Sequence, residues 1–311
     1  MFRAATAAIM PVRLLISLGL LAVLALWLDP VAIIGSIREL DPRWLAAAMA
    51  VGTLQYVLSA ERWRRTAARL EVPLGKREAL ANYYVAGFAN QVLPGGIAGD
   101  AGRAWRHSRS SGRPGPAIRA VILERASGQF VLVLAVTAVL AATTPGHRIL
   151  VALDASPWMV AALGAGLLLA GMVAAWRAGR VPGWLRTLIH DTHRALLARG
   201  AWPIQLSLSL MVFATYCAMF ACAGKMIGAD VAMTTLTVLA PIVLLAMLLP
   251  VSVAGWGVRE AAAASVWMAL GLPAAEGVAV SIGYGALCLL ASLPGAVILL
   301  TAPIRRRRQT S

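Results

Sequence analysis

Residues 93–103 read LPGGIAGDAGR, and residues 249–259 read LPVSVAGWGVR. The second segment begins 156 residues after the first, and Leu, Pro, Ala, Gly and Arg match in register. Both segments interrupt a long apolar stretch and end on an arginine. Matching interruptions in two halves of a membrane protein point to the binding site of a transporter. The repeat therefore predicts two related membrane units, residues 1–150 and 151–311.

Composition places the chain in a lipid bilayer. Hydrophobic residues make up 60% of it and charged residues 13%, and the mean hydropathy is +0.77. Soluble domains carry about 25% charged residues, so we expect an all-α polytopic membrane protein. The net charge of +15 would suggest nucleic acid in a soluble chain, but cytoplasmic arginines and attraction to anionic lipid explain it here. The expected partners are membrane lipids and not nucleic acid.

Cysteine and histidine give no sign of a cofactor. The three cysteines lie in apolar runs without a C-x-x-C pair, so neither a disulfide framework nor a zinc site is predicted. His190 and His193 flank Asp191 and lie one helical turn apart, but no third ligand is in view. We predict no metal and no cofactor.

The distribution of arginine gives a topology. Lys and Arg, which collect on the cytoplasmic side, are abundant in 61–79, 99–119, 177–202 and at both termini. Both termini are therefore predicted to be cytoplasmic, in a bacterial inner membrane. Apolar runs long enough to cross as helices are residues 12–28, 44–60, 120–142, 157–176, 203–224 and 277–301.

The two repeated motifs lie in further apolar stretches, 80–98 and 231–271. Basic segments flank 80–98 on both sides, and a single crossing would place one of them outside. We therefore predict a re-entrant broken-helix hairpin over about 80–113, and a mirror-image hairpin over about 231–271. About six spanning helices then form an inverted-topology repeat. Non-helical backbone at membrane depth must be covered by protein or line a cavity, so both bends are expected to line a cavity.

Residues 184–200 have the pattern of an amphipathic helix on the inner membrane surface. We interpret this segment as a linker between the two units. The alternative is a lipid-sensing or partner-docking element.

The first motif offers an anion site. Pro and Gly enforce a helix break, and the exposed amides of the following helix attract anions. Arg103 would add a clamp for phosphate, with Asp100 capping that helix and orienting Arg103. The alternative is that Arg103 is an ordinary cytoplasmic arginine. The candidate substrate-binding residues are Asn90, Gln91, Pro94, Gly95, Gly96, Gly99, Asp100 and Arg103.

The second motif places Arg259 and Glu260 inside long apolar sequence. Ionisable residues at membrane depth are costly and normally paired, either with each other or with Asp100 and Arg103 across a pseudo-twofold axis. The alternative is the end of an external loop. The candidate substrate-binding residues here are Ser252, Gly255, Gly257, Arg259 and Glu260.

Two further charged groups lie near predicted helix ends. Glu124 and Arg125 are candidates for a gate, for coupling or for a lipid phosphate contact, with a snorkelling pair as the alternative. The triplet 61–63 (Glu-Arg-Trp) is interpreted as an interfacial anchor.

Signatures of catalysis are missing from the sequence. It contains no nucleophile elbow, Asp-rich magnesium motif or Walker sequence, and no cytoplasmic segment is long enough to hold an active site. The chain is therefore expected not to be an enzyme.

The joint order of these motifs resembles the flippase-like family that includes the transmembrane domain of lysylphosphatidylglycerol synthase. The resemblance spans residues 10–301 and rests on Asn90-Gln91-x-Leu93-Pro94-Gly95-Gly96-x-x-Gly99-Asp100-x-x-Arg103, on Glu124-Arg125, and on Leu249-Pro250-x-Ser252-x-x-Gly255-x-Gly257-x-x-Glu260. It implies a lipid translocase embedded in the bilayer.

A soluble synthase domain is not part of this sequence, so the chain is expected not to aminoacylate a lipid, and lysylphosphatidylglycerol is in doubt as its substrate. The expected function is a flippase for a polar, phosphate-bearing or anionic lipid. The alternatives are an integral-membrane glycosyl or lipid transferase, and a non-transporting subunit of a lipid-synthesis complex. A homo-oligomer or a lipid-synthesis enzyme is a further possible partner.

Overall fold

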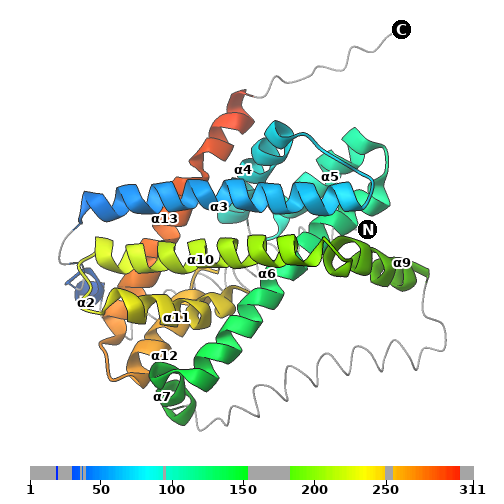
Figure 1. Cartoon of the computed structure of the whole chain (residues 1–311). Helices are drawn as coiled ribbons and strands as arrows, with labels where there is room; N and C mark the ends of the chain where they lie inside the picture. The colour runs from blue at the N-terminus through cyan, green and yellow to red at the C-terminus, as the bar shows by residue number, and fades with distance from the viewer. Residues whose placement is uncertain are drawn as a thin grey trace.

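The computed structural model describes residues 30–35, 37, 40–93, 96–152, 183–248 and 255–301, together with Gly19 (Figure 1). Within these ranges every regular element is a helix and none is a strand, which confirms the predicted all-α class. The predicted span 157–176 lies outside the described residues, as does 12–28 apart from Gly19. Pro94, Gly95 and residues 249–254 also lie outside them.

Four long helices form the frame: α3 (Pro42–Arg69), α6 (Pro114–Ala142), α10 (Trp202–Met226) and α13 (Ala274–Thr301). Of these, α6, α10 and α13 are long and apolar enough to cross a membrane. Proline stands in the first turn of α3, α6 and α10, where its missing N–H has no helical partner to lose. Large apolar side chains such as Phe130, Met211 and Val297 are exposed on these helices, as a lipid-facing surface requires.

Two broken helix pairs lie against this frame. In the first, α4 (Lys76–Val92) is followed by its C-cap residue Leu93. The backbone turns at Gly96 with φ +59°, and α5 (Ala98–Ser111) follows. In the second, α11 (Met233–Leu245) and the 3-10 turn η2 (Ala246–Leu248) are followed by α12 (Val258–Ala269). Gly255 and Gly257, with φ of +85° and +86°, precede α12. Both predicted helix breaks are confirmed.

The same helix order and the same packing pairs occur twice (Figure 1). The helices α3 and α10 run antiparallel: Asp41 at the start of α3 donates its N–H to the Met226 carbonyl (3.0 Å), while Arg69 at its end donates to the Gly200 carbonyl (3.4 Å). The helix α5 packs on α6 as α12 packs on α13. In addition α4 packs on α13 and α11 packs on α6, so each broken pair also contacts the long helix of the other half.

Shorter helices complete the described structure: α2 (Pro30–Gly35), α7 (Thr144–Ala152), α9 (Gly183–Thr192) and the π-helix η1 (His193–Leu197). The predicted amphipathic segment is thus helical up to Leu197. Asp191 accepts a hydrogen bond from Arg119 of α6 (2.5 Å), which fixes the segment to the first half. No cluster of three potential metal ligands occurs among the described residues.

Candidate functional site

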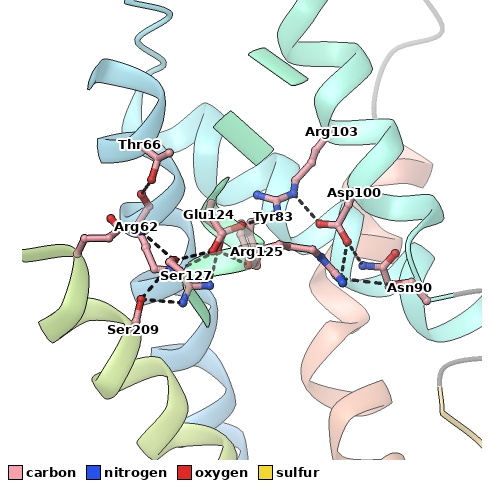
Figure 2. A network of polar contacts seen from close by, with 12 residues as sticks. Arg62, Thr66, Tyr83, Asn90, Asp100, Arg103, Glu124, Arg125, Ser127 and Ser209 are labelled. Carbon is pink, nitrogen blue, oxygen red and sulfur yellow. Dashed lines mark hydrogen bonds and ion pairs between the residues drawn. The ribbon is translucent and has the colours of Figure 1, made fainter. Parts of the chain in front are cut away.

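A buried ionic cluster joins three helices of the first half (Figure 2). Glu124 of α6 accepts hydrogen bonds from Arg62 of α3 (Nε to Oε1, 2.9 Å) and from Arg103 of α5 (Nη2 to Oε2, 2.6 Å). The Tyr83 hydroxyl donates to the same carboxylate at 3.2 Å. Glu124 and Arg103 are both fully buried. A buried charge is tolerated only when paired and hydrogen-bonded. Glu124 pairs with both arginines at once, although Nη1 of Arg103 is buried without a hydrogen-bond partner among the described residues.

Asp100 connects this cluster to the helix break. It accepts hydrogen bonds from Arg103 Nε (2.8 Å) and Asn90 Nδ2 (2.9 Å), and it forms an ion pair with Arg125 Nη2 (2.5 Å). The prediction that Asp100 orients Arg103 is confirmed. The prediction that Asp100 caps the following helix is wrong, because the Asn90 carbonyl oxygen accepts the Gly99 N–H instead (2.8 Å). The position of Asn90 on α4 allows its amide to bridge the two helices of the broken pair.

Among the described residues this cluster has a formal net charge of +1, since the three arginines Arg62, Arg103 and Arg125 pair with the two carboxylates Glu124 and Asp100. Arg103 is enclosed, with its guanidinium 4.9 Å from the Trp63 ring and 4.5 Å from the Tyr83 ring. By contrast, 37% of the Arg125 side chain is exposed. Arg125 is therefore the cation of this cluster that a ligand can reach most easily.

A cavity of about 320 Å³ opens beside Arg125. Its polar lining comes from both helices of the first break and from the long helices around it; this lining includes Gln55, Tyr56, Ser59, Arg62, Tyr83, Asn90, Gln91, Asp100, Arg125, Gln129 and Ser209. Its apolar lining includes Leu132, Val212, Phe213, Leu244, Met247 and Leu248. Since Leu248 and Gly255 flank the second break, the cavity extends from the first break to the second.

The second motif forms a separate and closed cluster. Arg259 Nη2 donates to Glu260 Oε1 (2.6 Å), and Arg259 Nε donates to Ser281 Oγ (2.9 Å). Glu260 also accepts the Gly257 N–H (2.6 Å), which caps the start of α12. The Arg259 guanidinium lies 5.0 Å from the Trp256 ring and 5.3 Å from the Tyr284 ring. Arg259 and Glu260 thus pair with each other, and the alternative partners Asp100 and Arg103 are engaged elsewhere.

The sequence-derived candidates fall into three groups. Those that line the cavity are Asn90, Gln91, Gly96, Asp100, Arg125 and Gly255. Those that lie in the polar clusters or the helix contacts without lining the cavity are Gly99, Arg103, Glu124, Gly257, Arg259 and Glu260. Those outside the described residues are Pro94, Gly95 and Ser252. Arg103 and Arg259, the two arginines predicted to bind an anion, are enclosed by aromatic rings and do not line the cavity, whereas Arg125 does.

The prediction that Arg62 belongs to an interfacial anchor is wrong. Arg62 is only 5% exposed and Trp63 is fully buried; the guanidinium binds Glu124 and, at 3.3 Å, Ser209. Within the triplet only Glu61 pairs locally, with Arg64 and Arg65. The carboxylate that holds Arg62 is 62 residues away in sequence, so no local pattern could reveal the pair.

Comparison with known proteins identifies a family and nothing closer. Neither the search of curated proteins nor the search of solved structures finds a match. The family model for the lysylphosphatidylglycerol synthase TM region matches residues 12–295, a range that includes both helix breaks, both charged clusters and every residue that lines the cavity. The chain belongs to the lysylphosphatidylglycerol synthase TM region family.

Proposed function

We propose that this protein is a flippase that moves a phosphate-bearing lipid between the leaflets of a bacterial inner membrane without catalysing a covalent reaction. The observation that carries the proposal is the amphipathic cavity. One part of its lining has hydrogen-bonding groups and the half-exposed Arg125, and another part is apolar. A headgroup would bind near Arg125, while the acyl chains would contact Leu, Met and Phe side chains or the surrounding lipid.

Helix length supports re-entrant breaks on both sides of this cavity. The 14 residues of α5 make a helix of about 21 Å and the 12 residues of α12 one of about 18 Å. Both are shorter than the roughly 30 Å hydrocarbon core of a bilayer. The bends would then lie at membrane depth, where irregular backbone must be covered by protein or line a cavity.

Alternating access would follow from the twofold pattern of packing. The antiparallel α3 and α10 and the recurring helix pairs favour an inverted-topology repeat, and the distribution of Lys and Arg favours cytoplasmic termini. In such repeats, transport results from movement of one unit against the other around a fixed site. Because each broken pair packs on both halves, such a movement would change the two breaks together.

The test is transport of labelled lipids in proteoliposomes that contain the full chain. We expect leaflet exchange of an anionic phospholipid by the wild type, reduced about tenfold or more by Arg125→Gln, because a charge-assisted hydrogen bond to phosphate is lost. Arg109→Gln is the matched control, since Arg109 is exposed on α5 and stacks on Trp105 at 4.9 Å. Unchanged exchange in folded Arg125→Gln would contradict the assignment of the headgroup to this cavity. Turnover of a labelled glycosyl or lipid donor would instead support a transferase.

A further inference from the structure

Several polar groups of the cavity have no partner within the described structure. Gln55, Gln91 and Gln129 line it and make no side-chain hydrogen bond to any described residue, and the same holds for the hydroxyls of Tyr56 and Ser59. The Gln55 Oε1 atom is buried and unpaired. A buried polar group left without a partner costs about 1–3 kcal/mol. These groups are therefore available to a ligand, unlike Asn90, which Gly99 and Asp100 already engage.

The chemistry of these uncommitted side chains favours a ligand whose headgroup carries hydroxyl groups. An amide side chain presents both donors and an acceptor, and a hydroxyl group can donate and accept at once. A headgroup with two or more hydroxyls would thus match the three glutamines and the two protein hydroxyls. A bare phosphate offers acceptors alone, so it would leave the Gln55 carbonyl oxygen unpaired.

The charges of the cavity disfavour an amine. Among the described lining residues the charged side chains are Arg62, Asp100 and Arg125. The only carboxylate of these, Asp100, already accepts hydrogen bonds from Arg103 and Asn90 and forms an ion pair with Arg125. An ammonium group would find no uncommitted carboxylate among the described lining residues, and it would meet a net charge of +1 in the adjoining cluster.

We propose that the cavity selects a phosphodiester headgroup that carries hydroxyl groups, of the glycerol or sugar type, over an aminated headgroup. This inference rests on the proposed function, since it names the class of lipid that the same site would take. Arg125 would contact the phosphate, and the uncommitted amides would bind the hydroxyls. The lipid form is the intended ligand, and a free polyol phosphate shares its headgroup chemistry.

Binding can be measured on the purified full chain in detergent, by the shift of its thermal unfolding midpoint. The probes are short-chain phosphatidylglycerol, phosphatidic acid and phosphatidylethanolamine, with soluble glycerol 1-phosphate as the arm without acyl chains. We expect phosphatidylglycerol to bind about threefold to tenfold more tightly than phosphatidic acid, the ratio that one or two neutral hydrogen bonds provide. Phosphatidylethanolamine is expected to bind most weakly. Equal or tighter binding of the amine lipid would overturn the proposal, and a dominant effect of glycerol 1-phosphate would assign the site to a soluble ligand.

The variants Gln55→Leu and Gln129→Leu sharpen this test. Each should abolish much of the preference for phosphatidylglycerol over phosphatidic acid while leaving the affinity for phosphatidic acid unchanged, a change that misfolding would not produce. Gln205→Leu is the matched control, because Gln205 does not line this cavity and donates to Ser127 (3.1 Å). A preference that survives in both cavity variants would reject the role of the amides.

Transport measured in parallel separates the two proposals. Selective binding without leaflet exchange would reject the flippase and keep the headgroup class. Leaflet exchange without any preference among the three lipids would reject the headgroup class alone.

Discussion

The two halves of the molecule have the same order of helices but different charged clusters at their helix breaks. The first half gathers three arginines and two carboxylates around its break. Two of these arginines, Arg62 and Arg125, line the cavity, and Arg125 is the more exposed. The second half pairs one arginine with one glutamate, and covers that arginine with Trp256 and Tyr284. The positive charge that a ligand can reach therefore belongs to the first half. A repeated motif therefore does not imply two equivalent binding sites.

The repeated glycine illustrates the same divergence. Gly99 and Gly255 occupy equivalent positions in the two motifs. Gly99 lies in α5, where a Cβ atom would overlap the carbonyl of Ala86 on α4. Gly255 instead adopts a φ of +85°, which residues with a side chain rarely take. One glycine permits close helix packing and the other permits a turn.

The largest expected effect comes from removing the central carboxylate of each cluster. Glu124→Gln leaves both Arg62 and Arg103 without that anion, whereas Glu260→Gln leaves only Arg259. Breaking a buried ion pair costs about 3–5 kcal/mol, and we expect Glu124→Gln at the upper end and Glu260→Gln at the lower end. Thermal unfolding in detergent, with the exposed Glu71→Gln as control, checks the order. A larger decrease of the unfolding midpoint in Glu260→Gln than in Glu124→Gln would contradict the expectation that Glu124 stabilises more buried charge.

A smaller difference is expected between the two glycines. Gly99→Ala places a methyl group against backbone, which cannot move aside, and overpacking of this kind costs about 1–3 kcal/mol or more. Gly255→Ala incurs about 1 kcal/mol of backbone strain, and the nearest atom to its new methyl group is Cγ of the flexible Met247, at 3.0 Å. The measurement is again the unfolding midpoint. Equal decreases of the unfolding midpoint would contradict the view that Gly99 is required for close helix packing and Gly255 for a turn.

The smallest expected effect concerns the contact between Glu71 of the first half and η1, which belongs to the predicted linker segment 184–200. Glu71 accepts from Arg194 of η1 (2.8 Å) and from Arg113 (3.5 Å), and these guanidinium groups lower the pKa of its carboxyl. Because the folded-state pKa is the lower one, this contact stabilises the fold at neutral pH and is lost as the pH falls through that pKa. Glu71→Gln should slightly reduce the acid sensitivity of the unfolding midpoint below about pH 4.3, the ordinary pKa of glutamate. An unchanged acid profile would show that the contact contributes nothing.

Sequence alone determined the membrane class, the all-helical architecture and the places where the helices break. These features depend on local properties: apolar runs long enough to cross a bilayer, and Pro and Gly residues that interrupt a helix wherever they occur. The repeat offset was also visible, because the two motifs are read in the same register. Four of the candidate residues around the first break, Asn90, Gln91, Gly96 and Asp100, line the cavity.

Tertiary structure decided which of the arginines a ligand can reach. Arg103 and Arg125 are both near the first motif in space, yet Trp63 and Tyr83 enclose one and leave the other half exposed. The pairing of Arg62 with Glu124 joins α3 to α6, and the cavity is lined by helices from both halves. Burial, charge pairing and cavity shape depend on groups brought together from distant parts of the chain, so no local pattern of residues encodes them.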